Sequence, residues 1–248
     1  MGIFIKNDEQ ISLMRYASRV VARTHEVVAK HIRPGITTGE LDKIAEEFIR
    51  SQDCTPSFKG YRGFPNSICV SVNDEVIHGV PGLRRLKNGD IVSIDLGVCY
   101  KRFHGDAART HPVGKVSEKH LKLIAVTEQS FFEGIKHAKD GHRLHDISNA
   151  IEDYVEAHGF SIVQEWCGHG IGRQVHEDPQ IPHTRQEKRG PRMARGMTLA
   201  VEPMINAGSY EIDTAKDTWT VVTKDGEYSA HYENTLLITD GEPDVLTI

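Results

Sequence analysis

Five residues of this chain are of the types that hold divalent metal ions, and each lies in a local sequence suited to that role. They are Asp95 in IVSIDLGV, Asp106 in HGDAARTH, His169 in CGHGIG, Glu202 in LAVEPM and Glu233 in HYENTLLIT. Four carboxylates and one imidazole suit hard or borderline ions such as Mn, Fe, Co or Zn. Their summed negative charge would balance two divalent cations and leave room for a bridging hydroxide. Because paired metals about 3.5–4 Å apart can generate hydroxide and polarise a carbonyl, the set predicts metal-assisted hydrolysis.

Two of these acids come at the ends of apolar runs. Asp95 follows IVSI, and Glu202 follows LAV. A carboxylate in such a strand would be desolvated, which is costly unless it is paired or bound to metal. A structural salt bridge to an arginine is the alternative for either acid alone. Two such strands, together with a histidine between Gly168 and Gly170, favour a shared metal site.

The chain contains a faint internal repeat. RPGITTGELDKIAEEFI, from Arg33, resembles AKDGHRLHDISNAIEDYV, from Ala138, and NGDIVSID, ending at Asp95, resembles RGMTLAVE, ending at Glu202. The repeat predicts one domain over residues 1–248 built from two related halves, approximately 1–110 and 111–248. Each half would bring a strand-borne carboxylate to a common centre. The alternative is that helices and strands look alike in any α/β protein.

Composition is that of an ordinary soluble globular protein, with 38% hydrophobic and 26% charged residues. A net charge of −5 argues against a nucleic-acid binder, sequence-specific or general. No apolar run is long enough to cross a membrane. The start, MGIFIKNDEQ, lacks signal-peptide features, and Lys6 lies where a myristoylation motif has Ser or Thr. The four cysteines form no C-x-x-C pair, as expected of free thiols in a reducing cytoplasm.

The pattern of apolar residues and caps predicts alternating helices and strands. Asn7 or Asp8 caps a first helix that Gly35 stops, and Thr37-x-x-Glu40 is a capping box for a second. Further helices are expected over 117–138 and 144–158, and strands over 67–72, 90–98, 160–165, 198–202, 219–223 and 234–239. A long loop over 179–195 contains the basic run RQEKRGPRMAR. A solvated loop is the favoured interpretation, and docking to ribosomal RNA is the functional alternative.

Two further histidines have the context of site residues. His78 in VIHGVP and His176 in QVHEDP each follow an apolar residue and precede a turn. Near a dimetal centre they could bind an oxyanion and donate a proton to a leaving amine. Loop histidines satisfied by backbone are the alternative. The absence of G-x-S-x-G and H-E-x-x-H motifs argues against a serine hydrolase and a zincin.

Taken together, NDEVIHGVP, SIDLGV, GDAARTHPVG, CGHGIGRQVHEDPQIPH, MTLAVEP and HYENTLLIT resemble the bacterial type I methionine aminopeptidases, over nearly the whole chain. The resemblance implies an α+β pita-bread fold, with two pseudo-symmetric α/β halves around a curved antiparallel sheet. It implies removal of the initiator methionine from nascent proteins with a small second residue, by dimetal-activated hydroxide attack on the peptide carbonyl. It also implies a cytoplasmic, monomeric hydrolase with two divalent ions (Co, Mn, Fe or Zn). A monovalent cation near Asn73, Glu75 and Ser229 is a weaker feature of the family.

The resemblance also implies roles for the residues of the site. Asp95 would chelate one metal, Asp106 and Glu233 would bridge both, and His169 and Glu202 would hold the other. Glu202 could also take the proton from the attacking water.

His78 matches the family's histidine near the scissile amide and leaving group, and His176 matches the one that binds the substrate carbonyl. The methionine pocket would consist of Phe58, Tyr61, Phe64, Cys69 and Trp219. An apolar, aromatic slot suits a thioether, and plain core is the alternative for these residues. The chain departs from the common bacterial pattern at Phe58 (often Cys), Phe64 (often Tyr) and Val175 (often aromatic).

Two rival functions share parts of this pattern. Aminopeptidase P and prolidase have the same five-ligand set but usually carry a large additional amino-terminal domain, which this sequence lacks. A non-catalytic pita-bread binding module would have lost metal ligands, whereas all five are present here.

Overall fold

The computed structural model describes residues 2–248, so Met1 of the predicted domain lies outside the described residues. The helices are α1 (Asp8–Ala29), α2 (Thr38–Ser51), α3 (Glu118–Ile135) and α4 (Leu144–Ala157), with a 3-10 turn η1 (Tyr61–Gly63). The strands are β1 (Thr55–Pro56), β2 (Cys69–Val72), β3 (Glu75–Ile77), β4 (Ile91–Tyr100), β5 (Phe103–Pro112), β6 (Ser161–Ile162), β7 (Gly168–Gly170), β8 (Glu177–Ile181), β9 (Thr198–Val201), β10 (Met204–Asn206), β11 (Ile212–Thr214), β12 (Val221–Thr223), β13 (Ser229–His231), β14 (Glu233–Leu237) and β15 (Asp244–Val245).

Both amino-terminal helices begin at the predicted caps. The Asn7 side chain accepts from the Gln10 N–H at 3.0 Å, and the Gln10 side chain accepts from the Asn7 N–H at 3.1 Å. Thr37 and Glu40 form the same reciprocal pair at the start of α2. The prediction that α1 runs on to Gly35 was wrong. The helix ends at Ala29 because the chain turns there, and the Gly35 N–H bonds to the Leu86 carbonyl.

The main sheet has nine strands in the order β1-β4-β5-β14-β9-β7-β8, with β2 paired to β4 and β15 to β14. All of its pairings are antiparallel. Three predictions about strands need correction. The strand predicted over 160–165 shrinks to β6, the strand over 219–223 begins only at Val221, and the loop over 179–195 begins after β8. The residues of β8 leave that loop because they pair with β7.

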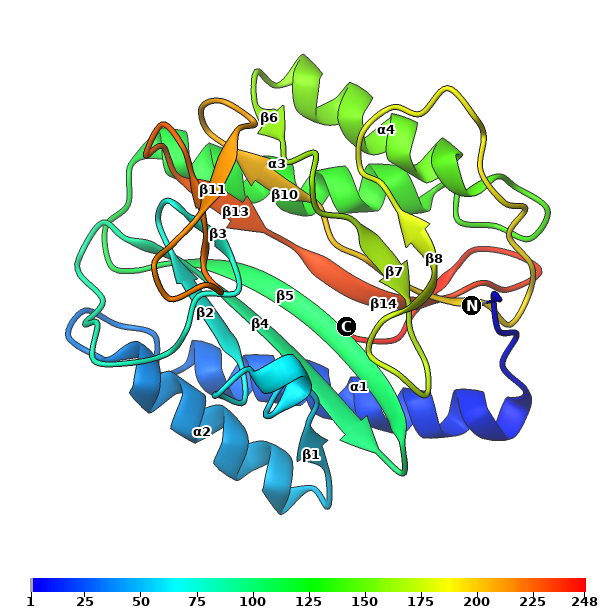
Figure 1. Cartoon of the computed structure of the whole chain (residues 1–248), viewed down its shortest axis with the longest axis horizontal. Helices are drawn as coiled ribbons and strands as arrows, with labels where there is room; N and C mark the ends of the chain where they lie inside the picture. Colours follow the sequence, from blue (N-terminus) through cyan, green and yellow to red (C-terminus); the bar gives the residue numbers. More distant parts are fainter. Residues whose placement is uncertain (1) are drawn as a thin grey trace.

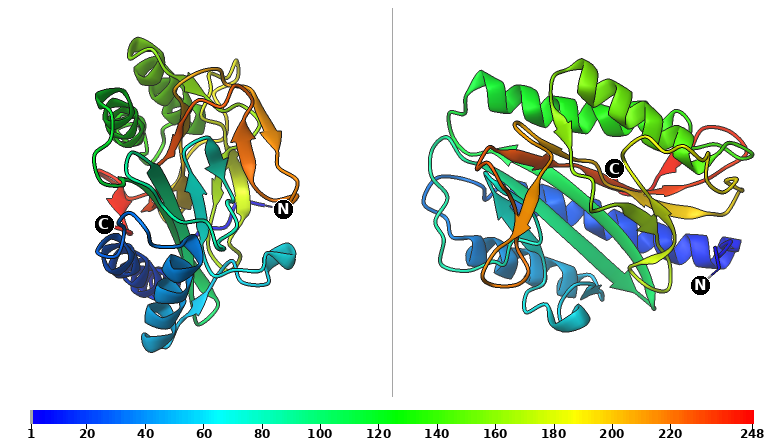
Figure 2. Two further views of the ribbon diagram at one scale, coloured as in Figure 1. Left: turned by 90° about the vertical axis from the view of Figure 1, so that its left-hand side faces the viewer. Right: turned by 45° about the horizontal axis from the view of Figure 1, so that its top comes forward.

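The helices cover one face of the sheet, α1 and α2 under one half and α3 and α4 under the other (Figures 1 and 2). Each half has its own apolar core. The first contains Val21, Leu41, Val92, Ile94 and Leu96, and the second contains Leu123, Phe131, Ile147, Leu199 and Leu236. In the sheet, β4 and β9 flank the central pair β5–β14 on opposite sides, and these are the strands that the sequence repeat matches. The observed architecture is therefore two α/β halves around one antiparallel sheet.

The seam between the halves is held partly by side chains. β5 and β14 are in backbone register only at Ala108–Glu233 and Ala107–Asn234. On one side of this stretch the Thr235 hydroxyl accepts from the Asp106 N–H and donates to the Asp106 carbonyl, both at 2.9 Å. On the other side the Thr110 hydroxyl bridges the backbone of His231 in the same way. Threonine hydroxyls thus replace direct backbone bonds on both sides of the two paired positions, Ala108–Glu233 and Ala107–Asn234.

None of the helices within residues 2–248 combines the length and the apolar character needed to span a membrane.

Candidate metal centre and substrate cleft

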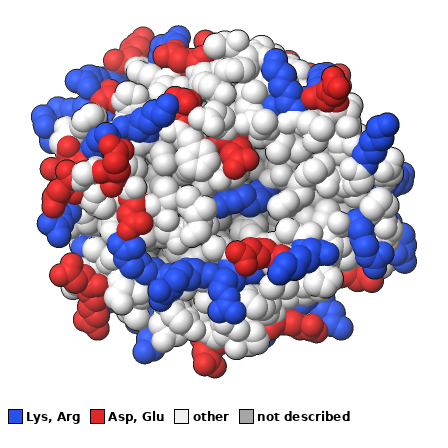
Figure 3. All heavy atoms as spheres, turned by 180° about the vertical axis from the view of Figure 1, so that it is seen from behind, with Lys and Arg blue, Asp and Glu red and all other residues white. Residues whose placement is uncertain are grey.

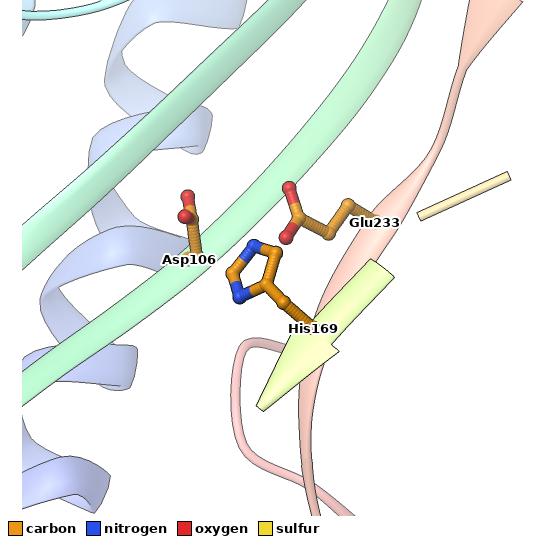
Figure 4. Close-up of side chains that lie close together, drawn as sticks. All are labelled: Asp106, His169 and Glu233. Carbon is orange, nitrogen blue, oxygen red and sulfur yellow. The ribbon is translucent and has the colours of Figure 1, made fainter. Parts of the chain in front are cut away.

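The five predicted metal ligands come together in one cleft of about 620 Å³. Asp95 lies on β4, Asp106 on β5, His169 on β7 and Glu233 on β14, and Glu202 directly follows β9. Donor atoms of Asp106, His169 and Glu233 lie within 4.8 Å of one another, and Figure 4 shows the three side chains pointing toward one another. Glu202 Oε1 lies 3.3 Å from His169 Nε2. The structure therefore gathers residues that are up to 138 positions apart in the chain (95 to 233).

Strand register explains why the acids share a face. Asp95 pairs with Ala108 and Asp106 pairs with Gly97 across β4–β5, and Ala108 pairs in turn with Glu233 of β14. Because directly paired residues project to the same side and alternate residues share a face, all three carboxylates project to one side of the sheet. Gly97 lets the segment with Phe58 pack directly on β4, because a Cβ at Gly97 would lie 2.8 Å from Ser57 Cβ and 3.0 Å from Phe58 Cε1.

None of the four predicted ligand carboxylates forms an ion pair with a lysine or arginine among residues 2–248, and the groups at ion-pair distance are His169 and His231, both beside Glu202. Asp95, Asp106 and Glu233 each have a buried carboxylate oxygen with no hydrogen-bond partner among the described residues. Burial raises the pKa of Asp95 to about 7 and that of Glu202 to about 8. Burial, followed by repulsion from the neighbouring acids, raises the pKa of Asp106 and of Glu233 well above the ordinary range. Unpaired buried acids in contact with a histidine fit divalent cations, which would supply the missing positive charge.

His169 is oriented as a neutral ligand. Its Nδ1 lies 2.9 Å from the Gly170 carbonyl, which can only accept, so Nδ1 carries the proton and the Nε2 lone pair is free. Burial lowers the pKa of His169 to about 3. The predicted close backbone approach beside His169 is confirmed. A Cβ at Gly168 would lie 2.4 Å from the Ala200 carbonyl oxygen, and one at Gly170 would lie 2.2 Å from that of Asp178.

His78 and His176 both line the same cleft. His176 Nδ1 lies 3.0 Å from the Tyr61 hydroxyl, and its ring centroid lies 4.3 Å from that of His169. His78 has a positive φ of 59° and packs edge-on against Trp166. Non-glycine residues with positive φ concentrate at functional sites. Burial lowers the pKa of each imidazole to about 4, so both are neutral at physiological pH.

The predicted methionine-pocket residues form an apolar wall of the cleft. Phe58, Phe64 and Cys69 cluster with Val175, and Trp219 packs against them with its ring edge-on to Phe64 at 5.2 Å. Tyr61 lines the same cleft. Burial raises the pKa of the Cys69 thiol well above its usual range, so the thiol stays neutral. These residues line the cleft, and their part in binding a methionine side chain stays a prediction.

Sequence reasoning missed several residues of the site. His231 Nε2 lies 3.6 Å from Glu202 Oε2, and His183 Nε2 accepts from the Glu202 N–H at 3.2 Å. Trp166 and Arg62 line the cleft. His231 is the first residue of the HYENTLLIT motif and ends β13, two residues before Glu233 begins β14, so its closeness to Glu233 in the sequence is the signal that could have found it. No pattern in the sequence pointed to His183.

Comparison with known proteins gives full-length matches. The profile of metallopeptidase family M24 matches residues 12–240. A methionine aminopeptidase from Clostridium perfringens is 56% identical over 246 residues, and methionine aminopeptidase 1 from Bacillus subtilis is 54% identical over 245, each match covering 99% of both chains. The crystal structure of a methionine aminopeptidase from Thermotoga maritima has a TM-score of 0.97 at 41% identity, over 99% of each chain. A prolidase from Pyrococcus furiosus, 21% identical over 98% of this chain and 65% of its own, shares the fold with a TM-score of 0.81.

These matches show that the chain belongs to metallopeptidase family M24, with the α+β pita-bread fold. Within that family, its relatives at 54% and 56% identity are methionine aminopeptidases that it matches from end to end. The family and the fold predicted from the sequence are confirmed.

Proposed function

We propose that this chain is a metal-dependent aminopeptidase that releases the N-terminal methionine of nascent proteins whose second residue is small. The observation that carries the proposal is one cleft containing both the buried acid–histidine cluster and the apolar wall of Phe58, Phe64, Cys69 and Trp219. An apolar, aromatic slot suits a thioether. The full-length similarity to methionine aminopeptidases supports the same activity.

Two divalent cations would be held by the five ligands. Asp95 would bind one, His169 and Glu202 the other, and Asp106 and Glu233 both. Bound cations supply a Lewis acid for the scissile carbonyl and lower the pKa of a water molecule. Carboxylate and imidazole ligands accept Mn, Fe, Co or Zn.

The histidines would act on the substrate itself. The Tyr61 hydroxyl can donate to His176 Nδ1 at 3.0 Å, which leaves Nε2–H of His176 to donate to the substrate carbonyl oxygen. His78 would stand near the scissile amide and help the leaving amine. Glu202 would accept the proton of the attacking water. Trp166 packs against His78 with 4.8 Å between ring centroids, and these two bulky rings would disfavour a large second side chain.

The same proposal includes a single domain over 1–248 with halves of approximately 1–110 and 111–248. It is supported by the two cores and by the β5–β14 seam between them. A cytoplasmic location and a monomeric state stay predictions. So does a monovalent cation near Asn73, Glu75 and Ser229, where the Ser229 N–H donates to the Asn73 carbonyl.

For the basic loop we favour the solvated interpretation over ribosome docking. Three of its four arginines are compensated within the molecule, in the ion pairs Arg185–Asp153, Arg189–Asp146 and Arg195–Asp240, and Arg192 donates to the Gly141 carbonyl. On the face seen in Figure 3, basic and acidic side chains are interspersed. A surface of mixed charge offers less to a polyanion than a field of one sign.

The test is peptide cleavage by metal-stripped protein reconstituted with Mn, Co or Fe. Met-Ala-Ser, Met-Lys-Ser and Ala-Pro-Ser are compared, with released amino acid quantified by mass spectrometry. We expect metal-dependent release of methionine from Met-Ala-Ser alone. Cleavage of Ala-Pro-Ser only would assign the prolidase-like activity instead, and no cleavage with any metal would favour a binding module.

A further inference from the structure

We propose that Lys6 is a positioning residue for the substrate cleft: its buried ion pair with Glu177 fixes the turn that carries Val175 and His176. The turn comprises residues 171–176 between β7 and β8. Lys6 lies outside the cleft and touches no substrate, so it would act through Glu177. We call the Lys6–Glu177 ion pair, together with the turn that it holds, the clamp. The roles of Val175 and His176 rest on the proposed function, whereas the clamp itself does not.

The ion pair is almost completely buried. Lys6 Nζ lies 2.8 Å from Glu177 Oε2, and the two side chains are 5% and 7% exposed. Ten other ion pairs of Lys or Arg with a carboxylate within residues 2–248 are shorter than 3.0 Å. In each of them at least one side chain is 20% exposed or more. The Lys6 backbone is also anchored, because its N–H donates to the Gly196 carbonyl at 2.8 Å. The Lys6 side chain is therefore held at both ends, by its backbone hydrogen bond and by its ion pair with Glu177.

The carboxylate of Glu177 joins this anchor to the turn. While Oε2 accepts from Lys6, Oε1 accepts from the Gln174 N–H at 3.1 Å and closes the segment from 174 to 177. Gly172 packs directly against the pair. A Cβ at Gly172 would lie 2.6 Å from Lys6 Cε and 2.8 Å from Glu177 Oε1, so the turn and the ion pair fit together without space for one extra carbon.

Two residues of the substrate cleft, Val175 and His176, lie next to this clamp in the chain. Val175 belongs to the apolar cluster with Phe58, Phe64 and Cys69, and His176 directly precedes Glu177 and reaches the Tyr61 hydroxyl. From the other side, the His104 N–H donates to the Gly172 carbonyl at 2.9 Å. The clamp thus holds one wall of the predicted methionine pocket and one of its two catalytic-site histidines together.

A buried ion pair is weak evidence for stability, because an apolar pair of similar volume is often as stable, whereas removing one partner is costly. A role in geometry is therefore separable from a role in stability. Lys6→Met removes the charge and the bond to Glu177. The double variant Lys6→Met/Glu177→Leu removes both charges and fills the space, and Lys6→Arg keeps the charge.

The experiment measures kcat and KM on Met-Ala-Ser, the Mn²⁺ affinity by calorimetry, and amide hydrogen exchange of the 171–177 segment by mass spectrometry. For Lys6→Met we expect kcat/KM to fall by up to about 100-fold, faster exchange in 171–177, and unchanged Mn²⁺ affinity. The double variant should recover its melting temperature but not kcat/KM, and Lys6→Arg should recover most of kcat/KM. Lys119→Met, which breaks a solvent-exposed pair with Glu227 on the surface, is the matched control and should change none of these.

Recovery of kcat/KM together with melting temperature in the double variant would show a merely structural pair and overturn the proposal. Unchanged exchange in 171–177 on Lys6→Met would overturn it as well. If the wild-type protein released no methionine, the proposed function would fail, and the exchange comparison would still decide whether Lys6 holds the turn.

Discussion

Two groups of acids in this molecule use the same side chains in opposite ways. The inner group, Asp95, Asp106, Glu202 and Glu233, projects from the sheet into the cleft, where Asp106 is 3% and Glu233 2% exposed. The outer group, Asp146, Asp153 and Asp240, lies around the basic loop, where each acid is paired with an arginine. The side chains of Asp153 and Asp240 are 64% and 70% exposed.

The two environments shift the pKa values of the acids in opposite directions. Burial raises the pKa of Asp95 to about 7, whereas a hydrogen bond from Arg189 lowers the pKa of Asp146. The inner acids repel one another and form no ion pair with a lysine or arginine among residues 2–248, so they are suited to bind metal. The outer acids are already neutralised by neighbours in water. The comparison teaches that the surroundings of an acid, more than its presence, define a metal site.

The largest effect should follow Asp106→Asn, which keeps shape but removes one of the two predicted bridging charges. We expect kcat/KM on Met-Ala-Ser to fall by at least about 100-fold. Changing a residue that only hydrogen-bonds to a metal ligand already costs up to about 100-fold, and loss of a ligand should cost no less. The metal-free variant should be no less stable than wild type, because a source of repulsion is gone. Asp146→Asn is the matched outer change and should leave kcat/KM unaltered. Equal effects of the two changes would abolish the distinction between the groups.

Metal removal should come next in size. A ligand at about 100 times its Kd stabilises the folded state by about 2.7 kcal/mol, which for a chain of this length corresponds to a melting temperature higher by about 5–10 °C. Calorimetric scans with Mn²⁺ and with excess chelator would measure the difference. Asp146→Asn should keep this shift and Asp106→Asn should lose it, and a wild-type protein indifferent to the chelator would contradict the account.

A third prediction concerns the arginine behind the inner group. Arg109 donates to the carbonyls of Ala108 and Glu233 and to the Asn234 side chain, and its guanidinium lies over the Tyr232 ring at 4.4 Å. Arg109→Met would take this donor away from the Ala108 and Glu233 carbonyls, whereas Asn234 Oδ1 would keep the Thr247 hydroxyl as a donor at 2.8 Å. We expect a loss of about 1–3 kcal/mol in the free energy of unfolding.

Urea unfolding would measure this loss for Arg109→Met beside Arg189→Met, the exposed counterpart on the outer group. Arg189→Met should scarcely change the unfolding midpoint, because its pair is solvated and screened. A larger loss for the exposed arginine would reverse the comparison.

A fourth prediction concerns the pH dependence of the stability of the metal-free protein. Carboxyls whose folded pKa is raised to about 7 and 8, as in Asp95 and Glu202, hold protons that the unfolded chain releases near pH 4. Their contribution to stability is therefore full below about pH 4 and is lost as the pH rises toward 8. Asp146, with a lowered pKa, contributes the other way, and its stabilisation is lost as the pH falls below the ordinary Asp range.

Urea midpoints from pH 4 to 8.5, with chelator and with saturating Mn²⁺, would test this. Bound cations need ionised ligands, so metal affinity should rise with pH while the stability of the metal-free protein falls. A metal-free protein that gained stability from pH 5 to 8 would argue that the inner acids are not desolvated.

Much of the site could be predicted because the sequence carries local signals for it. Apolar runs that end in Asp95 and Glu202 predicted strand-borne acids, and Gly168 and Gly170 predicted close backbone approach around His169. Asn7 or Asp8 as a cap, and the capping box of Thr37 and Glu40, predicted where two helices begin. In each case the cause lies within a few residues along the chain.

What the sequence did not reveal depends on contacts between distant segments. In the sequence Lys6 argued only against a myristoylation motif, but the fold buries it against Glu177. His183 reaches the Glu202 backbone only through the loop after β8, and Arg109 becomes buried only where β5 meets β14. The strand over 160–165 came out too long because the ladder with β10 pairs Ser161 and Ile162, and beyond them Val163 adds one bond to the Met204 carbonyl.

The most direct test of the central claim is equilibrium dialysis of metal-stripped protein against Mn²⁺, with bound ions counted by atomic absorption. The account predicts binding of about two ions per chain in wild type and in Asp146→Asn, and a marked loss in Asp106→Asn. A wild-type protein that bound no Mn²⁺, or an Asp106→Asn variant that bound as much as wild type, would contradict the claim that the inner acids form a metal centre.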